Sequence, residues 1–447
     1  VDLEKVPLKV ENMAPWEIWV SESQERMMFT VKPENVEQVL ARCEAWDVEA
    51  VTIGEVITEK RNIVKFRGVE ILNLDLEFTT GGPTYRRAYD LPDYDTGVAT
   101  ALPEYPKDLE KKILDVISHP EIASKDWVIR QYDHEVRGKT ALKPIQGPIG
   151  RDVPGDSSVL KPVDDSWKGL ALTADVNPYL MEANPYHGTM SAVEEVCRNL
   201  AAVGARIDSL ADCLCFGNPQ KPDIMGQFKA SCEALRDAAT AIDVPYVSGN
   251  VSLYNETAEG AIPPTPVLMG VGLVNDIRRC TTSDMKSEGT IWLVGKTKKE
   301  MGASLYYRTI GKDCPNIPKT DFDSFIPKME QLIQAIEQGE VMACHDISTG
   351  GLAIAVIEMC MSGIGAKIIL TDEMRADIEL FSESNGRWIV QVAKGLEDDF
   401  AERFKWATKI GDIGDTVSFS KDNKIIAEFE IEELRNAWKT PIWERLA

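Results

Sequence analysis

Two copies of one segment occur in this sequence, and the repeat constrains the fold more than any other feature. Ser21–Arg26 (SESQER) precedes the apolar run Met27–Val31, and Ser382–Arg387 (SESNGR) precedes Trp388–Val392. An acidic helical stretch follows each copy, and then a glycine turn flanked by β-branched residues. We therefore predict a duplicated fold, with a strand after each copy of the motif.

The two copies stand at different distances from the start of their units. Ser382 lies 235 residues after Gly147, where the second unit begins, whereas Ser21 has 20 residues before it. From the repeat alone we expect about 210 further residues upstream of Val1. We therefore interpret the first half as truncated in this sequence.

After Gly147, short apolar runs alternate with helical patterns, which predicts an α/β (α+β) fold. We expect one domain over residues 147–287, with strands at 169–173, 207–214, 244–247 and 266–274, and helices near 190–200 and 224–242. A second domain, residues 288–447, should hold strands at 290–294, 366–370 and 388–392 and helices at 325–338 and 352–361.

Two N-terminal segments complete the predicted organisation. Residues 1–80 read as the remainder of the first half's C-terminal domain. Residues 81–146 are rich in Pro, Gly and charged residues and read as a connector that contains one helix, at 106–118.

Charge and hydropathy exclude several classes of partner. The 72 acidic and 49 basic residues give a net charge of −23, which disfavours nucleic acids and anionic membranes. No apolar run approaches the roughly 18 residues of a membrane-spanning helix. The nine cysteines are odd in number and scattered, a pattern typical of a reducing cytoplasm.

Cys213 and Cys215 lie two residues apart in a predicted strand, so their side chains should point the same way. Two interpretations stay open for this pair. It is either a metal site or two small residues of the core.

Several short motifs give weak signals. Gly295-Lys296-Thr297 resembles the end of a phosphate loop, but the preceding glycine stands one residue too far upstream. Gly270-Val271-Gly272 lacks the third glycine of a dinucleotide fingerprint. The four histidines show no metal-type spacing, and no nucleophile elbow occurs, so we expect no glutamine hydrolysis by this chain.

Three segments have the composition of ligand-facing loops. Residues 211–219 and 247–255 each carry carboxylate, amide or hydroxyl groups and glycine after an apolar strand, which suits Mg²⁺ and phosphate. The alternative for each is an Asx-turn that ends a strand. In the third, residues 345–352, we favour Ser348 or Thr349 as a helix N-cap over an anion site.

These blocks together resemble the phosphoribosylformylglycinamidine synthase family of the aminoimidazole-ribonucleotide-synthetase superfamily. The resemblance rests on residues 21–27, 172–178, 212–219, 248–257 and 345–352. It implies two halves, each with an N-terminal and a C-terminal α/β domain. It also implies an ATP-dependent ligase of purine biosynthesis that converts formylglycinamide ribonucleotide and ammonia to formylglycinamidine ribonucleotide, ADP and phosphate.

The resemblance also implies roles for individual residues. Those expected to contact substrate are Glu22, Ser23, Gln24 and Ser252; those expected to contact ATP are Asp212 and Gly249; and Asn250 is expected to ligate Mg²⁺. The family's catalytic residues would lie upstream of Val1, so we expect none in this chain and no activity from it alone. Ammonia would come from a separate glutaminase subunit, joined through a small bridging subunit.

Two positions depart from the family pattern. Cys215 stands where Asn is usual, and Thr349 stands where Asp is common. Two rival hypotheses remain: another enzyme of the superfamily, and a non-catalytic scaffold half that binds nucleotide without turning it over.

Overall fold

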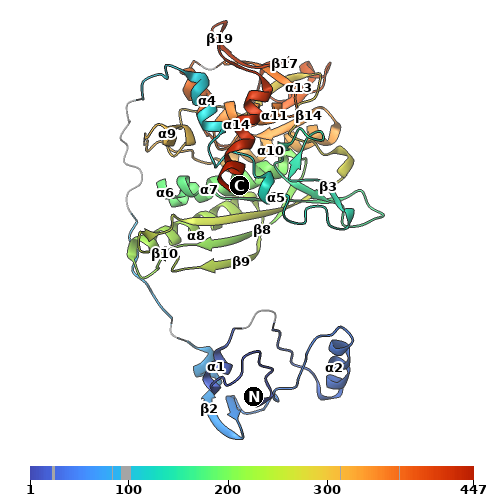
Figure 1. Ribbon diagram of the computed structural model, residues 1–447, viewed down its shortest axis with the longest axis vertical. Helices are drawn as coiled ribbons and strands as arrows, with labels where there is room; N and C mark the ends of the chain where they lie inside the picture. Colours follow the sequence, from blue (N-terminus) through green and yellow to red (C-terminus); the bar gives the residue numbers. More distant parts are fainter. Residues whose placement is uncertain (23–25, 83, 92–101, 313, 372, 447) are drawn as a thin grey trace. The chain divides into compact units, whose positions relative to one another are not determined.

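The computed structural model describes residues 1–22, 26–82, 84–91, 102–312, 314–371 and 373–446 (Figure 1). It divides into two compact units, Val1–Arg86 and Arg87–Ala447. Strands and helices of the second unit alternate along the chain, which confirms the α/β prediction. No described helix is both long enough and apolar enough to cross a bilayer.

The first unit is a small assembly around one β-hairpin. Its elements are η1 (Leu3–Lys5), α1 (Pro15–Val20), η2 (Pro33–Asn35), α2 (Val36–Glu44), β1 (Arg61–Phe66), β2 (Val69–Asp75) and α3 (Leu76–Thr80). Both turn residues, Arg67 and Gly68, have positive φ, as a tight hairpin turn requires. The buried core of this unit consists of Leu3, Ile18 and Val64.

The internal repeat is confirmed as an order of elements. In the second unit, α12 (Ala376–Phe381) and α13 (Glu397–Arg403) flank the second copy as α1 and α2 flank the first. The hairpin of β18 (Val417–Lys421) and β19 (Lys424–Phe429) corresponds to β1 and β2. Among the described residues, only the second copy is followed by a strand paired on both sides.

The predicted strand Met27–Val31 is wrong: the segment forms no strand, and Met27 is 80% exposed. Its counterpart, β16 (Trp388–Val392), is fully buried between β13 (Thr290–Val294) and β14 (Val341–Asp346). Both neighbours precede β16 in the chain, and the described residues before Met27 supply no equivalent pair. A strand needs a ladder partner, so the same local pattern gives different structures.

The second unit contains a six-stranded sheet with the order β3-β6-β7-β12-β8-β9. Its strands are β3 (Thr140–Leu142), β6 (Ser158–Leu160), β7 (Gly169–Asp175), β8 (Arg206–Cys215), β9 (Tyr246–Ser252) and β12 (Thr265–Val274). β8 and β9 pair in parallel, and the other neighbours are antiparallel. This sheet carries the strands of the predicted 147–287 domain.

Helices cover one face of the six-stranded sheet. α7 (Pro185–Ala202) packs on β7 and β12 and against α8 (Pro222–Ile242). A Cβ at Gly270 would lie 2.4 Å from the Val196 side chain of α7, so glycine there permits the close approach of the helix. Gly270 therefore has a packing role, which accounts for the weak glycine motif.

The other face of this sheet is partly exposed. Along β12, Leu268 is buried, whereas Met269 is 41% and Leu273 is 48% exposed. Alternate residues of a strand point to opposite faces, so Met269 and Leu273 mark an open face.

A seven-stranded sheet with the order β14-β16-β13-β17-β15-β18-β19 forms the rest of the second unit. Its remaining strands are β15 (Gly365–Ile369) and β17 (Ala407–Gly414). The helices of this part are α9 (Leu305–Thr309), α10 (Phe322–Gln338), α11 (Gly351–Cys360), α12, α13 and α14 (Ile431–Leu446). α10 packs on α7 and α8, so the two predicted domains lie within one compact unit. Their boundaries stay predictions.

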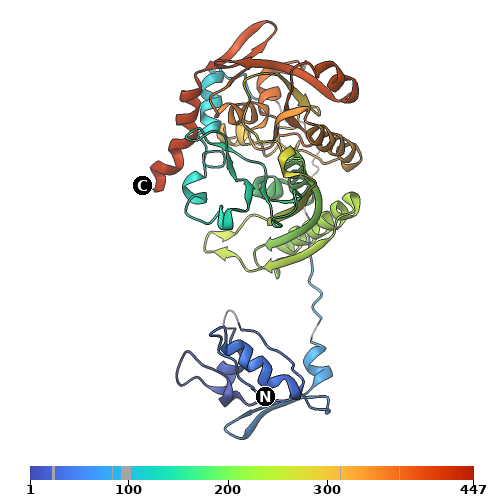
Figure 2. The same ribbon diagram turned by 90° about the vertical axis from the view of Figure 1, so that its right-hand side faces the viewer.

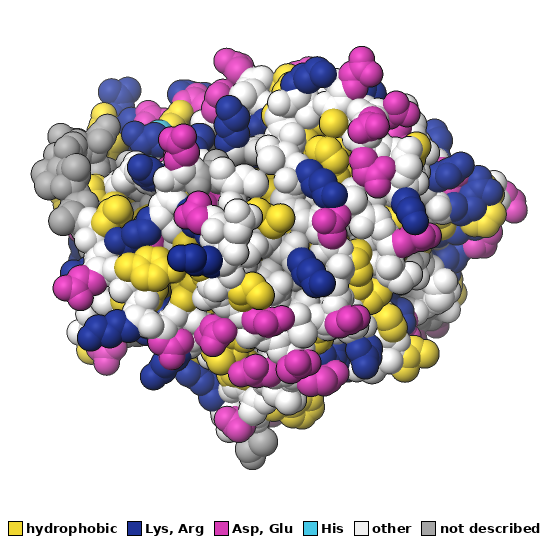
Figure 3. All heavy atoms as spheres, turned by 90° about the horizontal axis from the view of Figure 1, so that it is seen from above, with side chains coloured by type: hydrophobic (Ala, Val, Ile, Leu, Met, Phe, Trp, Pro, Cys, Tyr) yellow, Lys and Arg dark blue, Asp and Glu magenta, His cyan; other side chains and the backbone are white. Residues whose placement is uncertain are grey.

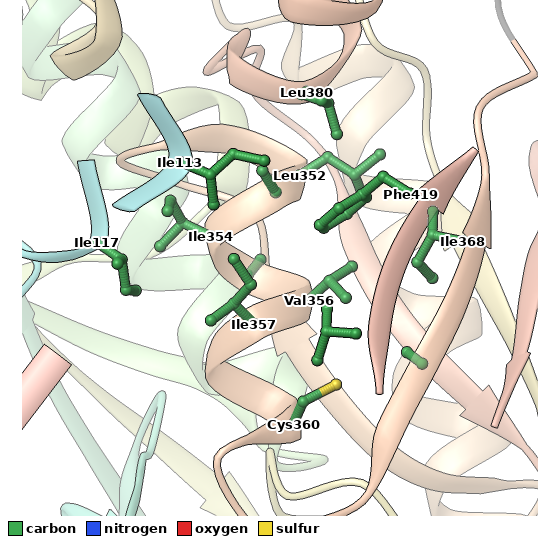
Figure 4. Close-up of a cluster of buried hydrophobic side chains, with 14 of the residues drawn as sticks. Ile113, Ile117, Leu352, Ile354, Val356, Ile357, Cys360, Ile368, Leu380 and Phe419 are labelled. Atoms are coloured by element: carbon green, nitrogen blue, oxygen red, sulfur yellow. The ribbon is translucent and has the colours of Figure 1, made fainter. Parts of the chain in front are cut away.

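α11 forms the centre of the larger core (Figure 4). Its side chains are apolar apart from Glu358, and every other residue of the helix is buried. Ile354 and Ile357 point toward Ile113 and Ile117, and residues on the other side meet Phe419.

The predicted helix in residues 81–146 exists as α4 (Leu109–Ile117), but it is not part of a loose connector. Leu109, Ile113, Val116 and Ile117 are buried in the same core as α11. Figure 2 shows α14, in red, beside α4. The apolar side of α4 is buried because the helix packs into this core. The composition of the segment alone does not reveal that packing.

Short elements complete the unit. They are α5 (Asp126–Ile129), η3 (Val136–Gly138), β4 (Ile145–Gln146), β5 (Val153–Pro154), α6 (Pro178–Ala183), β10 (Glu256–Thr257), β11 (Gly260–Ala261) and η4 (Ile277–Arg279). On the face drawn in Figure 3, acidic and basic side chains are interspersed over most of the surface, and a group of acidic side chains lies together toward its lower edge.

Candidate functional site

The predicted ATP and Mg²⁺ residues meet on two neighbouring strands, β8 and β9. The parallel register pairs Asp212 with Gly249, Cys213 with Asn250, and Cys215 with Ser252. The prediction of a loop after residue 247 is wrong in detail, because β9 continues to Ser252. β9 is the last strand of its sheet, so its outer edge has no strand partner among the described residues.

Asp212 and Gly249 lie on the helix-covered side of the sheet. Asp212 is in register with the buried Leu268. A Cβ at Gly249 would stand 3.0 Å from both carboxylate oxygens of Asp212, so a larger residue would displace that carboxylate. Burial raises the pKa of Asp212. The absence of a side chain at Gly249 therefore makes room for the Asp212 carboxylate.

Asn250 and Ser252 lie on the opposite, open side. The Asn250 amide donates to Cys213 Sγ at 3.4 Å, and the Ser252 hydroxyl donates to Asn255 Oδ1 at 3.3 Å. Asn255 in turn donates to the Phe216 carbonyl at 3.0 Å, which fixes the turn after β9. The four predicted residues therefore lie close together on β8 and β9. Asp212 and Gly249 face the helix-covered side of the sheet, however, and Asn250 and Ser252 face the open side.

The thiols of Cys213 and Cys215 point the same way, as predicted, with their sulfur atoms 3.7 Å apart. Both side chains are half-buried. Burial, together with the neighbouring Cys213 thiol, raises the pKa of Cys215.

The residues of the first SES copy belong to the other unit. Glu22 is exposed there, while Ser23 and Gln24 lie outside the described residues. Their expected contact with substrate stays a prediction.

In the second copy, the corresponding polar residues serve the protein itself. Glu383 Oε1 accepts the backbone amides of Leu305 at 2.9 Å and Gly350 at 2.8 Å. Burial raises the pKa of Glu383 to about 7. The Asn385 amide donates to Ser191 and Thr320 at 2.8 and 2.9 Å. These partners leave little capacity for a ligand at the second copy.

The expectation that Ser348 or Thr349 caps a helix is wrong. Gly350, in the left-handed conformation, is the N-cap residue of α11, so no side chain caps this helix. Ser348 and Thr349 instead line a cavity of about 480 Å³.

Titratable side chains meet at this cavity. His345 Nδ1 lies 2.7 Å from Asp156 and its Nε2 lies 3.2 Å from Glu358. Burial alone would lower the pKa of His345, but Asp156 and Glu358 raise it well above its ordinary value. Potential ligand atoms of Asp156, His345 and Asp346 lie within 4.8 Å of one another, a spacing that a metal ion could share.

A buried arginine balances much of the acidic charge beside the cavity. Arg198 lies 3.1 Å from Asp346 and 3.3 Å from Glu195, and it also pairs with Glu194. Burial raises the pKa of Asp175 to about 7 and that of Glu195 well above its ordinary value. Arg198 therefore offsets part of the acidic charge, and burial favours the protonated forms of Asp175 and Glu195.

The sequence identifies residues 345–352 as a candidate segment but does not identify Asp156, which lies 189 residues from His345 in the chain. The available signal was His345-Asp346 directly after an apolar strand. The phosphate-loop motif has a structural role instead: Thr297 Oγ1 accepts a hydrogen bond from the buried Arg387 at 3.0 Å.

Two family descriptions match parts of this chain. "AIR synthase related protein, N-terminal domain" matches residues 154–274, and "AIR synthase related protein, C-terminal domain" matches residues 1–67 and 312–421. The two C-terminal matches fall on the two copies of the internal repeat, which supports the duplication.

Named relatives agree with this assignment. The chain is 34% identical, over 98% of its length, to 58% of "Phosphoribosylformylglycinamidine synthase subunit PurL" of Thermoplasma acidophilum. It is 38% identical, over 97% of its length, to 60% of the same subunit of Thermococcus sibiricus. It thus spans about 60% of the length of these relatives.

A solved structure shares the fold. "T. maritima PurL complexed with ATP" aligns with a TM-score of 0.60 and 20% identity, over 92% of this chain and 59% of that one. The chain therefore belongs to the AIR synthase related proteins and, among them, is a relative of the PurL synthetase subunits.

Proposed function

We propose that the chain is part of an ATP-dependent ligase that converts formylglycinamide ribonucleotide and ammonia to formylglycinamidine ribonucleotide, ADP and phosphate. The observation that carries this proposal is the register of β8 and β9, which places Asp212 beside Gly249 and Asn250 one residue further along. The relatives' name supports the reaction, and T. maritima PurL structures complexed with ATP and with FGAR support the two ligands.

Each residue of this strand pair has a chemical role in the proposal. Asp212 accepts hydrogen bonds from the nucleotide on the helix-covered side, and Gly249, which lacks a side chain and lies in the edge strand, lets the phosphates pass close to the backbone toward Asn250 on the open side. The Asn250 amide oxygen suits Mg²⁺ without adding negative charge beside phosphates, and bound Mg²⁺ would neutralise charge on the transferred phosphoryl group. Ser252, held by Asn255, would hydrogen-bond the substrate.

The chemistry requires two steps. The formamide oxygen attacks the γ-phosphate and releases ADP, and ammonia then displaces phosphate from the iminophosphate to give the amidine. We assign the catalytic residues to the remainder of the enzyme, and Glu22, Ser23 and Gln24 to substrate contact from the first copy.

The open face of the six-stranded sheet supports a partner domain. Exposed Met269 and Leu273 on that face suit coverage by the equivalent domain of the other half. We further assign the ammonia supply to a separate glutaminase subunit joined through a small bridging subunit, and the whole complex to the cytoplasm.

Turnover by the full-length synthetase tests the function. With formylglycinamide ribonucleotide, ammonia and Mg²⁺ present, we expect ATP hydrolysis that depends on all three. Asn250→Ala should lower kcat/KM by about 100-fold or more, a loss of about 3 kcal/mol in transition-state stabilisation. Asp212→Ala should raise the KM for ATP.

The control is Asn275→Ala, which removes an exposed amide that donates to Glu337. Its kcat/KM should match that of the unchanged enzyme. Nucleotide binding without turnover in the full-length protein would overturn the ligase and favour the scaffold hypothesis.

A further inference from the structure

The thiol pair on the open side of the sheet has no role in the proposed ligase reaction. Cys213 Sγ and Cys215 Sγ are 3.7 Å apart, and the Asn250 amide lies 3.4 Å from Cys213 Sγ. All three side chains project from neighbouring positions of β8 and β9 toward the face marked by Met269. Three potential ligand groups therefore converge on one side of the sheet.

A disulfide does not suit this pair. Residues two apart on a strand are separated by about 6.6 Å at their Cα atoms, given a rise of about 3.3 Å per residue. That spacing is at the upper end of the range in which disulfides form, about 6.8 Å. The extended geometry of β8 therefore favours two thiols over a bridge.

We propose that Cys213, Cys215 and Asn250 form a binding site for a thiophilic divalent cation of the zinc type. A tetrahedral ion with metal–sulfur bonds of about 2.3 Å holds two sulfurs about 3.8 Å apart, close to the spacing of this pair. Rotation of the Asn250 amide presents Oδ1 as a third ligand. Water completes the shell, because the side chains are only half-buried.

Occupation of this site would interfere with the proposed ligase, and this consequence rests on the proposed function. Asn250 cannot ligate Mg²⁺ beside the nucleotide while its oxygen is turned toward the thiol pair. The cation is therefore expected to inhibit turnover in competition with Mg²⁺.

Cobalt(II) titration of the full chain under reducing conditions tests the site without any assay of activity. We expect one equivalent of Co²⁺ to produce a sulfur-to-cobalt charge-transfer band in the near ultraviolet. Cys215→Asn, which restores the family's usual residue, should weaken binding by more than about 100-fold. Circular dichroism of the variant establishes that it folds.

Cys232→Ser is the matched control, because it removes a half-buried thiol of α8 and should leave the band intact. A band of equal strength in Cys215→Asn, or no band in the unchanged chain, would overturn the proposed site.

A separate assay addresses the consequence for the ligase. In the full-length enzyme, Zn²⁺ should raise the KM for Mg²⁺ in the unchanged protein but not in Cys215→Ser. Cobalt binding without turnover under any condition would retain the thiol site and overturn the ligase function instead.

Discussion

At the scale of single residues, Glu383 shows how a buried carboxylate links the repeat motif to the loop before α11. A single oxygen, Oε1, accepts both backbone amides. Gln retains that oxygen, so Glu383→Gln should keep both hydrogen bonds. Glu383→Ala should leave two buried amides without a partner and lower the free energy of unfolding by about 2–4 kcal/mol.

The same residue gives a pH prediction. Burial raises the pKa of Glu383 to about 7 from 4.5, so the folded protein binds the extra proton between these values. The free energy of unfolding therefore falls as pH rises through that window, by about 3 kcal/mol from this group. In urea unfolding, Glu383→Gln should gain that amount relative to the unchanged chain between pH 4.5 and 7.

Glu402→Gln removes an exposed carboxylate of α13 and should show no such gain. A parallel pH dependence of the unchanged chain and Glu383→Gln would contradict the burial of an ionisable group at this position.

At the scale of elements, α4 is a helix packed into the core and not part of a flexible connector. Ile113 is fully buried against α11. Ile113→Ala should lower the free energy of unfolding of the second unit by about 2–5 kcal/mol, because it creates a cavity in a dense core. The control Lys111→Ala, at an exposed position, should change it by less than about 0.5 kcal/mol. Equal effects of the two changes would indicate a loosely attached helix.

Sequence patterns predicted individual helices and strands better than they predicted which strands pair and which residues meet in the fold. The sequence predicted the helices α4, α8 and α10, and alternation placed the two cysteine side chains on one face of β8. The run Met27–Val31 failed because strand formation depends on partners that no local pattern encodes. The pairing of Asp156 with His345 was missed for the same reason, since only the tertiary fold brings them together.

The assignment of site residues shows the same limit. The sequence identifies Asp212, Gly249 and Asn250 as separate candidates without placing them together, and the parallel pairing of β8 and β9 is what makes them neighbours. The division of Asp212 from Asn250 between two faces follows from the register, which the sequence does not specify alone.

At the scale of the whole molecule, the two units differ greatly in buried apolar area. The first unit buries three hydrophobic residues in its core, whereas the second contains two extended clusters. We expect scanning calorimetry to show two transitions, with the first unit melting at the lower temperature. Val64→Ala should shift only the lower transition and Ile113→Ala only the upper one. A single transition that both substitutions shift would contradict the separate unfolding of the two units.

Exposed Met27, Met28 and Phe29 also predict self-association of the isolated chain. Their counterparts in β16 are buried between two neighbouring strands. Burial of Met27, Met28 and Phe29 would need a similar pair of strands. Sedimentation of the isolated chain should detect association, and a monomer at all accessible concentrations would contradict the expectation.

Incorporation of labelled ammonia tests the ligase account most directly. The full-length synthetase would be supplied with ¹⁵N-ammonia, formylglycinamide ribonucleotide, ATP and Mg²⁺, and its products analysed by mass spectrometry. The account predicts one ¹⁵N in the amidine for each ADP formed, and loss of both products in Asn250→Ala. ADP formed without ¹⁵N incorporation, or unchanged labelling in Asn250→Ala, would contradict it.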